Sequence, residues 1–96
     1  MRPSAALAAN REKLLSIAAA RGASNLRVFG SVVRGSDAEG SDLDLLVDIA
    51  PGTSLLGYVG LQLDIQDALG IHVDLCTEEE LHPSLRERIL AEARPV

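Results

Sequence analysis

Three aspartates, Asp42, Asp44 and Asp74, stand out because they interrupt apolar runs that are typical of β-strands. In the run "DLDLLVDI" the first two are two positions apart, so their side chains would point to the same face of a strand. Like charges placed so closely repel each other and do not favour folding, which indicates a binding role. If the run "IHVDLC" forms a neighbouring strand, the three carboxylates converge and can bind divalent cations. Mg²⁺ suits such a site because it accepts carboxylate and phosphate oxygens, and two ions would clamp an in-line displacement at phosphorus.

A candidate anion site precedes these aspartates in the chain. Gly30 and Ser31 follow a short apolar run and open a predicted helix, whose first N–H groups and positive dipole can bind a phosphate. Gly30 would let the backbone approach the ligand closely, and Arg34, one helical turn later, could bind another phosphate oxygen. A Gly-Ser turn of this kind is common in α/β proteins. Its combination with the carboxylates is specific and indicates a site for a nucleotide and metal ions.

Simpler roles remain open for these and neighbouring residues. Any single aspartate could be an ordinary polar residue on a solvated sheet face. His72 shares the predicted face of Asp74 and could bind metal, although a polar residue of the sheet surface is the simpler interpretation. Asp48 lies too far along its strand to join the site, roughly 13 Å from Asp44 at the usual rise, and is expected to be a surface or partner contact. Cys76 is expected to be a small core or edge residue.

The elements that must position these residues alternate along the chain. The boundary residues Pro3 and Gly22 predict one N-terminal helix between them, and Gly70 marks the end of a later helix. The predicted order is α-β-α-β-α-β-α, which indicates a small α/β domain over residues 1–96 with helices packed on a sheet. The further predicted elements are strands Leu26–Phe29, Asp42–Ile49 and Ile71–Cys76, helices Ser31–Arg34 (capped by Ser31), Leu55–Leu69 and Pro83–Ala93, and a capped turn at "TEEEL".

Composition limits the possible functions. The 96 residues carry a formal net charge of −5, which argues against direct binding to nucleic acid duplexes because these require a basic surface. The single Cys76 permits no internal disulfide, so we expect a reducing cytoplasm. No apolar run approaches the length of a membrane span, and the charged N-terminal segment does not have the pattern of a signal peptide.

The motif "GSVVRG" followed by "SDLDLLVD" resembles the signature of the DNA polymerase beta-like nucleotidyltransferase superfamily. It is most similar to the minimal nucleotidyltransferases, the antitoxins of HEPN/MNT toxin–antitoxin pairs. The resemblance implies a small mixed sheet in a nucleotidyltransferase fold. It also implies that Gly30 and Ser31 bind the triphosphate, that Asp42 and Asp44 bind both Mg²⁺ ions, and that Asp74 is the third carboxylate.

The activity implied by this resemblance is transfer of AMP from ATP to a tyrosine hydroxyl of a cognate HEPN ribonuclease toxin. Asp74 would accept the proton of the attacking hydroxyl, because the third carboxylate lies nearest the nucleophile in the resembling fold. One alternative is an antitoxin that neutralises its toxin by binding alone. Another is a nucleotidyltransferase acting on a small molecule such as an antibiotic, although such enzymes resemble this domain with an added substrate-binding domain.

The predicted helix Leu55–Leu69 is apolar around more than one face. Neighbouring helices could bury all of it. Alternatively, part of this helix, including Tyr58, is exposed and binds the toxin.

Overall fold

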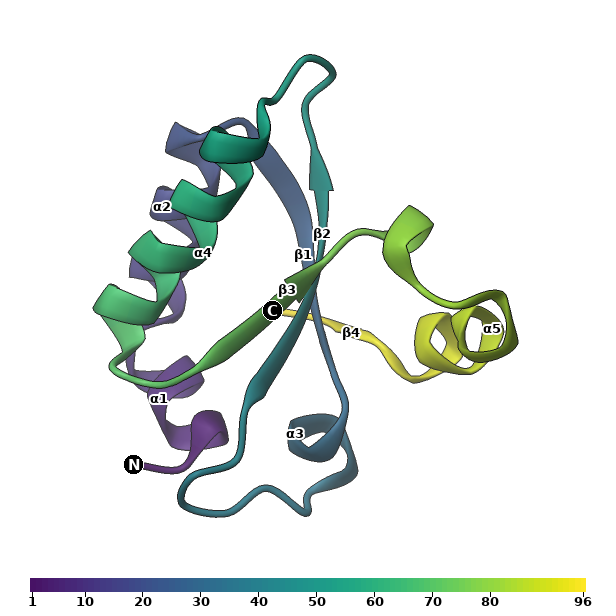
Figure 1. Ribbon diagram of the computed structural model, residues 1–96. Coiled ribbons are helices and arrows are strands. Elements are labelled where there is room, and N and C mark those ends of the chain that lie inside the picture. Colours follow the sequence, from purple (N-terminus) through teal and green to yellow (C-terminus); the bar gives the residue numbers. More distant parts are fainter.

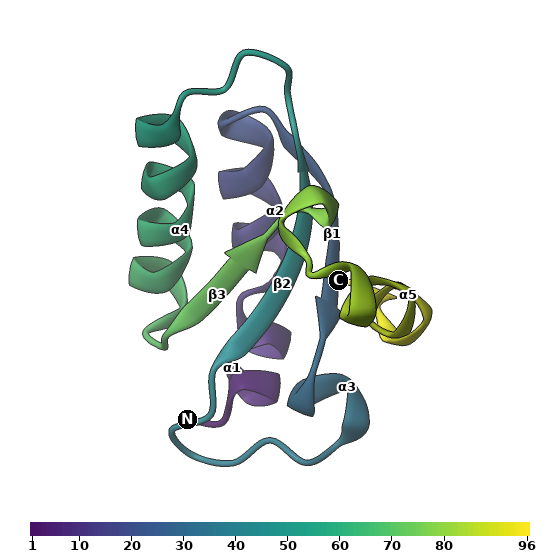
Figure 2. The ribbon, with the colours of Figure 1, turned by 45° about the vertical axis from the view of Figure 1, so that its right-hand side comes forward.

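The computed structural model describes residues 1–96 and contains a four-stranded sheet with helices on both faces (Figures 1 and 2). Helices α1, α2 and α4 cover one face, α5 lies on the other, and α3 lies at one end of the sheet. The predicted mixture of helices and a small mixed sheet is confirmed. The elements are α1 (Pro3–Ala9), α2 (Arg11–Ala20), β1 (Ala23–Phe29), α3 (Ser31–Arg34), β2 (Leu43–Ile49), α4 (Leu55–Leu69), β3 (Val73–Cys76), the 3₁₀ turn η1 (Glu78–Glu80), α5 (Pro83–Glu92) and β4 (Arg94–Pro95).

The sheet has the strand order β3-β2-β1-β4. Strand β1 pairs with β2 and with β4 in antiparallel fashion, whereas β2 and β3 are parallel. Parallel neighbours need a crossover connection, which α4 supplies. The two aspartate-bearing strands are neighbours, which was the condition for the carboxylates to converge, and Asp44 lies opposite Asp74 in their register.

The core is divided between the two faces of the sheet. Leu43, Leu45 and Val47 of β2 are buried in the larger cluster, which also contains core residues of α2 and α4. Leu46 points the other way and packs with Leu81 and Ile89, which α5 and its preceding segment contribute. This alternation follows from the two-residue period of a strand and places Asp44 on the α5 face.

The prediction of a single N-terminal helix between Pro3 and Gly22 is wrong. The helix breaks at Asn10, whose φ of −124° and ψ of 18° separate α1 from α2. The Asn10 side-chain amide donates to the Ala6 carbonyl at 3.0 Å, so it competes with the backbone for the helix end. A short helix can therefore end and a second can begin without a glycine or proline at the junction.

Strand boundaries also differ from those expected. Strand β1 begins at Ala23 rather than Leu26, and it includes Asn25, whose φ of 51° lies where the register with β2 shifts. The two-residue strand β4 was not expected, and it ends the last helix at Glu92. None of the helices combines the length and the apolar composition needed to span a membrane.

Candidate active site

The carboxylates converge where β2 and β3 begin. Asp44 and Asp74 are opposite each other in the parallel register, and Asp42 precedes β2 on the same face as Asp44. Asp42 and Asp74 are exposed, whereas Asp44 is half-buried. The structure therefore brings together the three residues expected to bind metal, and it leaves two of them open to solvent.

The ionisation of Asp44 is opposed by its surroundings. Burial, and then the negative charges of Asp74 and Asp42, raise the pKa of Asp44 to about 6. A divalent cation between these carboxylates would offset the repulsion, so the donor set fits Mg²⁺, which prefers carboxylate oxygens. Asp42 and Asp44 would hold the two ions expected from the sequence, and Asp74 would complete the oxygen donors.

His72 lies beside the carboxylates. Its Nδ1 atom is 3.0 Å from Asp42 Oδ1 and 3.8 Å from Asp74 Oδ1. One donor atom from each of these three residues lies within 4.8 Å of the others, an arrangement that can hold a metal ion. The geometry is compatible with the expected possibility that His72 binds metal, and the simpler interpretation as a polar residue of the sheet surface stays open.

The Gly-Ser turn lies directly against this cluster. Gly30 has φ 78° and ψ −148°, which only glycine adopts without strain, and it is the N-cap of α3. A Cβ atom at Gly30 would collide with Asp44 Oδ2. Ser31 is the first helical residue of α3, so the expectation that its side chain caps this helix is wrong. The residues expected to bind phosphate and those expected to bind metal are thus neighbours in space.

Arg34 points toward the end of α5. Its guanidinium donates to Glu92 Oε1 at 2.7 Å, while Glu92 Oε2 accepts the Gly30 N–H at 3.1 Å. Glu92 was not singled out in the sequence, where nothing local distinguishes it from the other charged residues of the last helix. The predicted contact between Arg34 and a phosphate competes with this ion pair.

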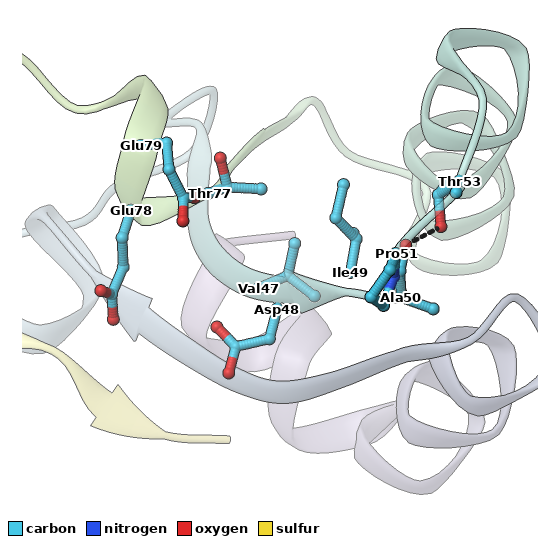
Figure 3. Close-up of a pocket in the computed structure, with 10 residues that line it drawn as sticks. Val47, Asp48, Ile49, Ala50, Pro51, Thr53, Thr77, Glu78 and Glu79 are labelled. Carbon is cyan, nitrogen blue, oxygen red and sulfur yellow. Dashed lines mark hydrogen bonds between the residues drawn. The ribbon is translucent and has the colours of Figure 1, made fainter.

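The largest cavity, about 640 Å³, lies at the opposite end of β2 (Figure 3). Its lining includes the carboxylates of Asp48, Glu78 and Glu79. The nearby Arg27 is already paired with Asp48 and Glu78, each at 3.0 Å. This cavity includes neither the Gly30–Ser31 turn nor Asp42, Asp44 and Asp74, so it is separate from the candidate active site.

A family model described as "Nucleotidyltransferase domain" matches residues 11–96. The chain belongs to this nucleotidyltransferase family and is a nucleotidyltransferase. Within the family it is similar to minimal nucleotidyltransferases. A solved structure described as a candidate minimal nucleotidyltransferase is 47% identical, covers 97% of this chain and 95% of that chain, and superposes with a TM-score of 0.85.

Two curated relatives are archaeal. A Methanocaldococcus jannaschii protein named as a candidate protein adenylyltransferase is 39% identical over 86% of this chain and 89% of its own length. The protein adenylyltransferase MntA of Thermococcus cleftensis is 38% identical over 74% of this chain and 72% of its own length. A more distant structure, a toxin–antitoxin with AMP-PNP, is 20% identical with a TM-score of 0.75 over 90% of this chain and 71% of that chain, and it shows the shared fold alone.

Proposed function

We propose that this nucleotidyltransferase is an antitoxin that transfers AMP from ATP to a tyrosine hydroxyl of a cognate HEPN ribonuclease toxin in the cytoplasm. The observation that carries the proposal is the convergence of Asp42, Asp44 and Asp74 beside the Gly30–Ser31 turn. The names of the curated relatives support protein as the acceptor. The relative from Thermococcus cleftensis is named MntA, as is the protein of an MntA–HpeT toxin–antitoxin structure, and this shared name supports a toxin as that protein.

The chemistry follows from the positions of the side chains. Asp42 and Asp44 would hold two Mg²⁺ ions, which supply positive charge to the triphosphate. The acceptor oxygen attacks the α-phosphorus, the bond from that phosphorus to its bridging oxygen breaks, and pyrophosphate leaves. Asp74 is exposed to an incoming acceptor and receives the hydroxyl proton. Such a proton transfer typically contributes ~10²–10⁴-fold to the rate.

The surface of α4 supports a protein partner. Leu61, Ile65 and Leu69 are buried against the sheet, but Leu56 and Leu63 are 84% and 51% exposed. Leu55 and Val59 are exposed as well, so these four side chains form an apolar stripe, which is typical of an interaction site. We propose that this stripe (Leu55, Leu56, Val59 and Leu63) is the surface that binds the toxin.

Tyr58 is not part of the stripe. Its hydroxyl donates to Glu80 Oε1 at 2.6 Å and lies 3.0 Å from the Leu75 carbonyl oxygen, which fixes α4 to the end of β3. The earlier expectation that Tyr58 contributes to an exposed surface is therefore corrected, because the ring is half-buried and its hydroxyl is engaged.

The proposal is tested by incubating the chain with ATP, Mg²⁺ and the product of the neighbouring gene, followed by peptide mass spectrometry. We expect an AMP adduct on a tyrosine of that product. The double variant Asp42→Asn/Asp44→Asn should produce no adduct while remaining folded. Neutralisation of the toxin without an adduct would instead support an antitoxin that acts by binding alone, and modification of a small molecule only would support the other alternative.

A further inference from the structure

One carboxylate connects the last helix to both ends of α3. Glu92 accepts the Gly30 N–H at 3.1 Å through Oε2 and the Arg34 guanidinium at 2.7 Å through Oε1. The Glu92 side chain is only 19% exposed, whereas that of Arg34 is 59% exposed. Burial works against ionisation of Glu92, but the bonds from Gly30 and Arg34 outweigh it and hold the Glu92 pKa below its ordinary value. Glu92 is therefore a charged acceptor with two fixed donors.

The hydrogen bond from Gly30 to Glu92 satisfies the backbone N–H of the residue that caps the start of α3. Gly30 is the N-cap, and in a capping box the third helical residue is a Glu or Gln that accepts the N-cap N–H. In α3 that residue is Val33, which has no acceptor in its side chain. Glu92, 62 positions away in the chain, supplies this contact instead.

Glu92 is itself anchored by its neighbours. Ile89, one turn earlier in α5, is buried with Leu46 and Leu81. Strand β4 follows Glu92 almost directly and pairs with Arg27 and Val28 of β1, just before the Gly30 turn. The end of α5 is thus held on the sheet from both sides, which gives the carboxylate a defined position.

We infer that Glu92 is a positioning residue for the nucleotide: from α5 it fixes the Gly30 turn and Arg34, and so sets the turn that is proposed to bind the triphosphate at a fixed place beside Asp44. The inference rests on the proposed function. Under that function a single triphosphate must meet both the Gly30–Ser31 turn and the metal ions held by the carboxylates, so the separation of the turn from the carboxylates determines how well it binds. Gly30 lies so close to Asp44 that an added Cβ atom would collide with Asp44 Oδ2, so a displacement of Gly30 would change that separation.

The same contacts indicate that Arg34 helps to hold the Gly30 turn in place through Glu92. Its guanidinium pairs with Glu92 at the end of α3, and the positive charge of Arg34 acts to lower the pKa of Asp44. The opposite interpretation is that Glu92 occupies the place of a phosphate and must be displaced by ATP. The two interpretations predict opposite changes in ATP affinity when the Glu92 carboxylate is removed. Removal of a competitor strengthens ATP binding, whereas removal of a positioning residue weakens it.

The test measures binding of a non-hydrolysable ATP analogue with Mg²⁺ by calorimetry in wild type, Glu92→Ala and Glu92→Gln. We expect Glu92→Ala to weaken affinity about tenfold, as loss of a charge-assisted hydrogen bond would. Glu92→Gln should bind with intermediate affinity, because its amide oxygen can still accept the Gly30 N–H. Glu87→Ala, on an exposed position of the same helix, is the matched control and should bind as wild type does.

Hydrogen exchange at the Gly30 amide gives a second readout. We expect faster exchange in Glu92→Ala and near-normal exchange in Glu92→Gln, with unchanged Mn²⁺ binding in both because Asp42, Asp44 and Asp74 are untouched. Unaltered or stronger nucleotide affinity in a folded Glu92→Ala would overturn the positioning role. Failure of the proposed function is distinct from this outcome, since it would show as a wild-type chain that binds the nucleotide and transfers nothing to the toxin.

Discussion

Removing the charge of Asp44 should stabilise the metal-free protein. Burial and the carboxylates of Asp74 and Asp42 raise the pKa of Asp44 from 3.8 to about 6, so the folded protein binds a proton here more tightly than the unfolded chain does. The stability gained from that proton is fully present below pH 3.8 and is lost as the pH rises through about 6. At pH 7.5 the ionised carboxylate therefore destabilises the fold, and Asp44→Asn removes this cost.

The size of the effect follows from the two pKa values. A difference of about two pH units corresponds to about 3 kcal/mol in the free energy of unfolding. Because the site is open to solvent, screening reduces this, and we expect a gain of about 1 kcal/mol for Asp44→Asn. In a domain of this size, that corresponds to a melting temperature higher by roughly 5 °C.

The assay is urea denaturation of wild type and Asp44→Asn with a chelator present, at pH 7.5 and at pH 4. We expect the variant to be more stable at pH 7.5 and the difference to become small at pH 4. Asp67→Asn is the matched control, because Asp67 is exposed on α4 and should show neither effect. An Asp44→Asn protein less stable than wild type at pH 7.5 would refute the reasoning that this carboxylate serves the metal site and not the fold.

Three further predictions concern the turn, the metal and the partner. Gly30→Val should abolish calorimetric binding of ATP with Mg²⁺, because its side chain would collide with Asp44 at a positive φ; normal affinity would place the triphosphate elsewhere. His72→Gln should weaken Zn²⁺ binding at least tenfold in calorimetric titrations while Mg²⁺ binding changes little, since imidazole favours transition metals; equal losses would contradict a ligand role. Leu56→Glu with Leu63→Glu should reduce toxin capture in a pull-down with ATP affinity intact, and unchanged capture would move the docking surface away from α4.

The convergence of the three aspartates at one edge of the sheet could be predicted because it depends on local periodicity. The alternation of Leu43, Leu45 and Val47 with Asp42 and Asp44 determines which face each side chain occupies, and the run around Asp74 repeats the pattern. The role of Gly30 in the turn could likewise be predicted, since few residues other than glycine adopt a positive φ.

Contacts between distant parts of the chain were not predictable in the same way. Glu92 meets Gly30 only because β4 and the core beneath α5 place the end of that helix beside the turn. Strand β4 consists of two residues and has no periodicity of its own. The break at Asn10 depends on a side-chain bond that competes with helical bonding, and a pattern of apolar residues does not report such competition.

The most direct test of the central claim compares ATP labelled at the α-phosphate with ATP labelled at the γ-phosphate, each incubated with the chain, Mg²⁺ and the cognate toxin. The account predicts that the toxin acquires the α label, acquires no γ label, and acquires neither with Asp42→Asn/Asp44→Asn. Transfer of the γ label, or retention of α-label transfer by the double variant, would contradict it.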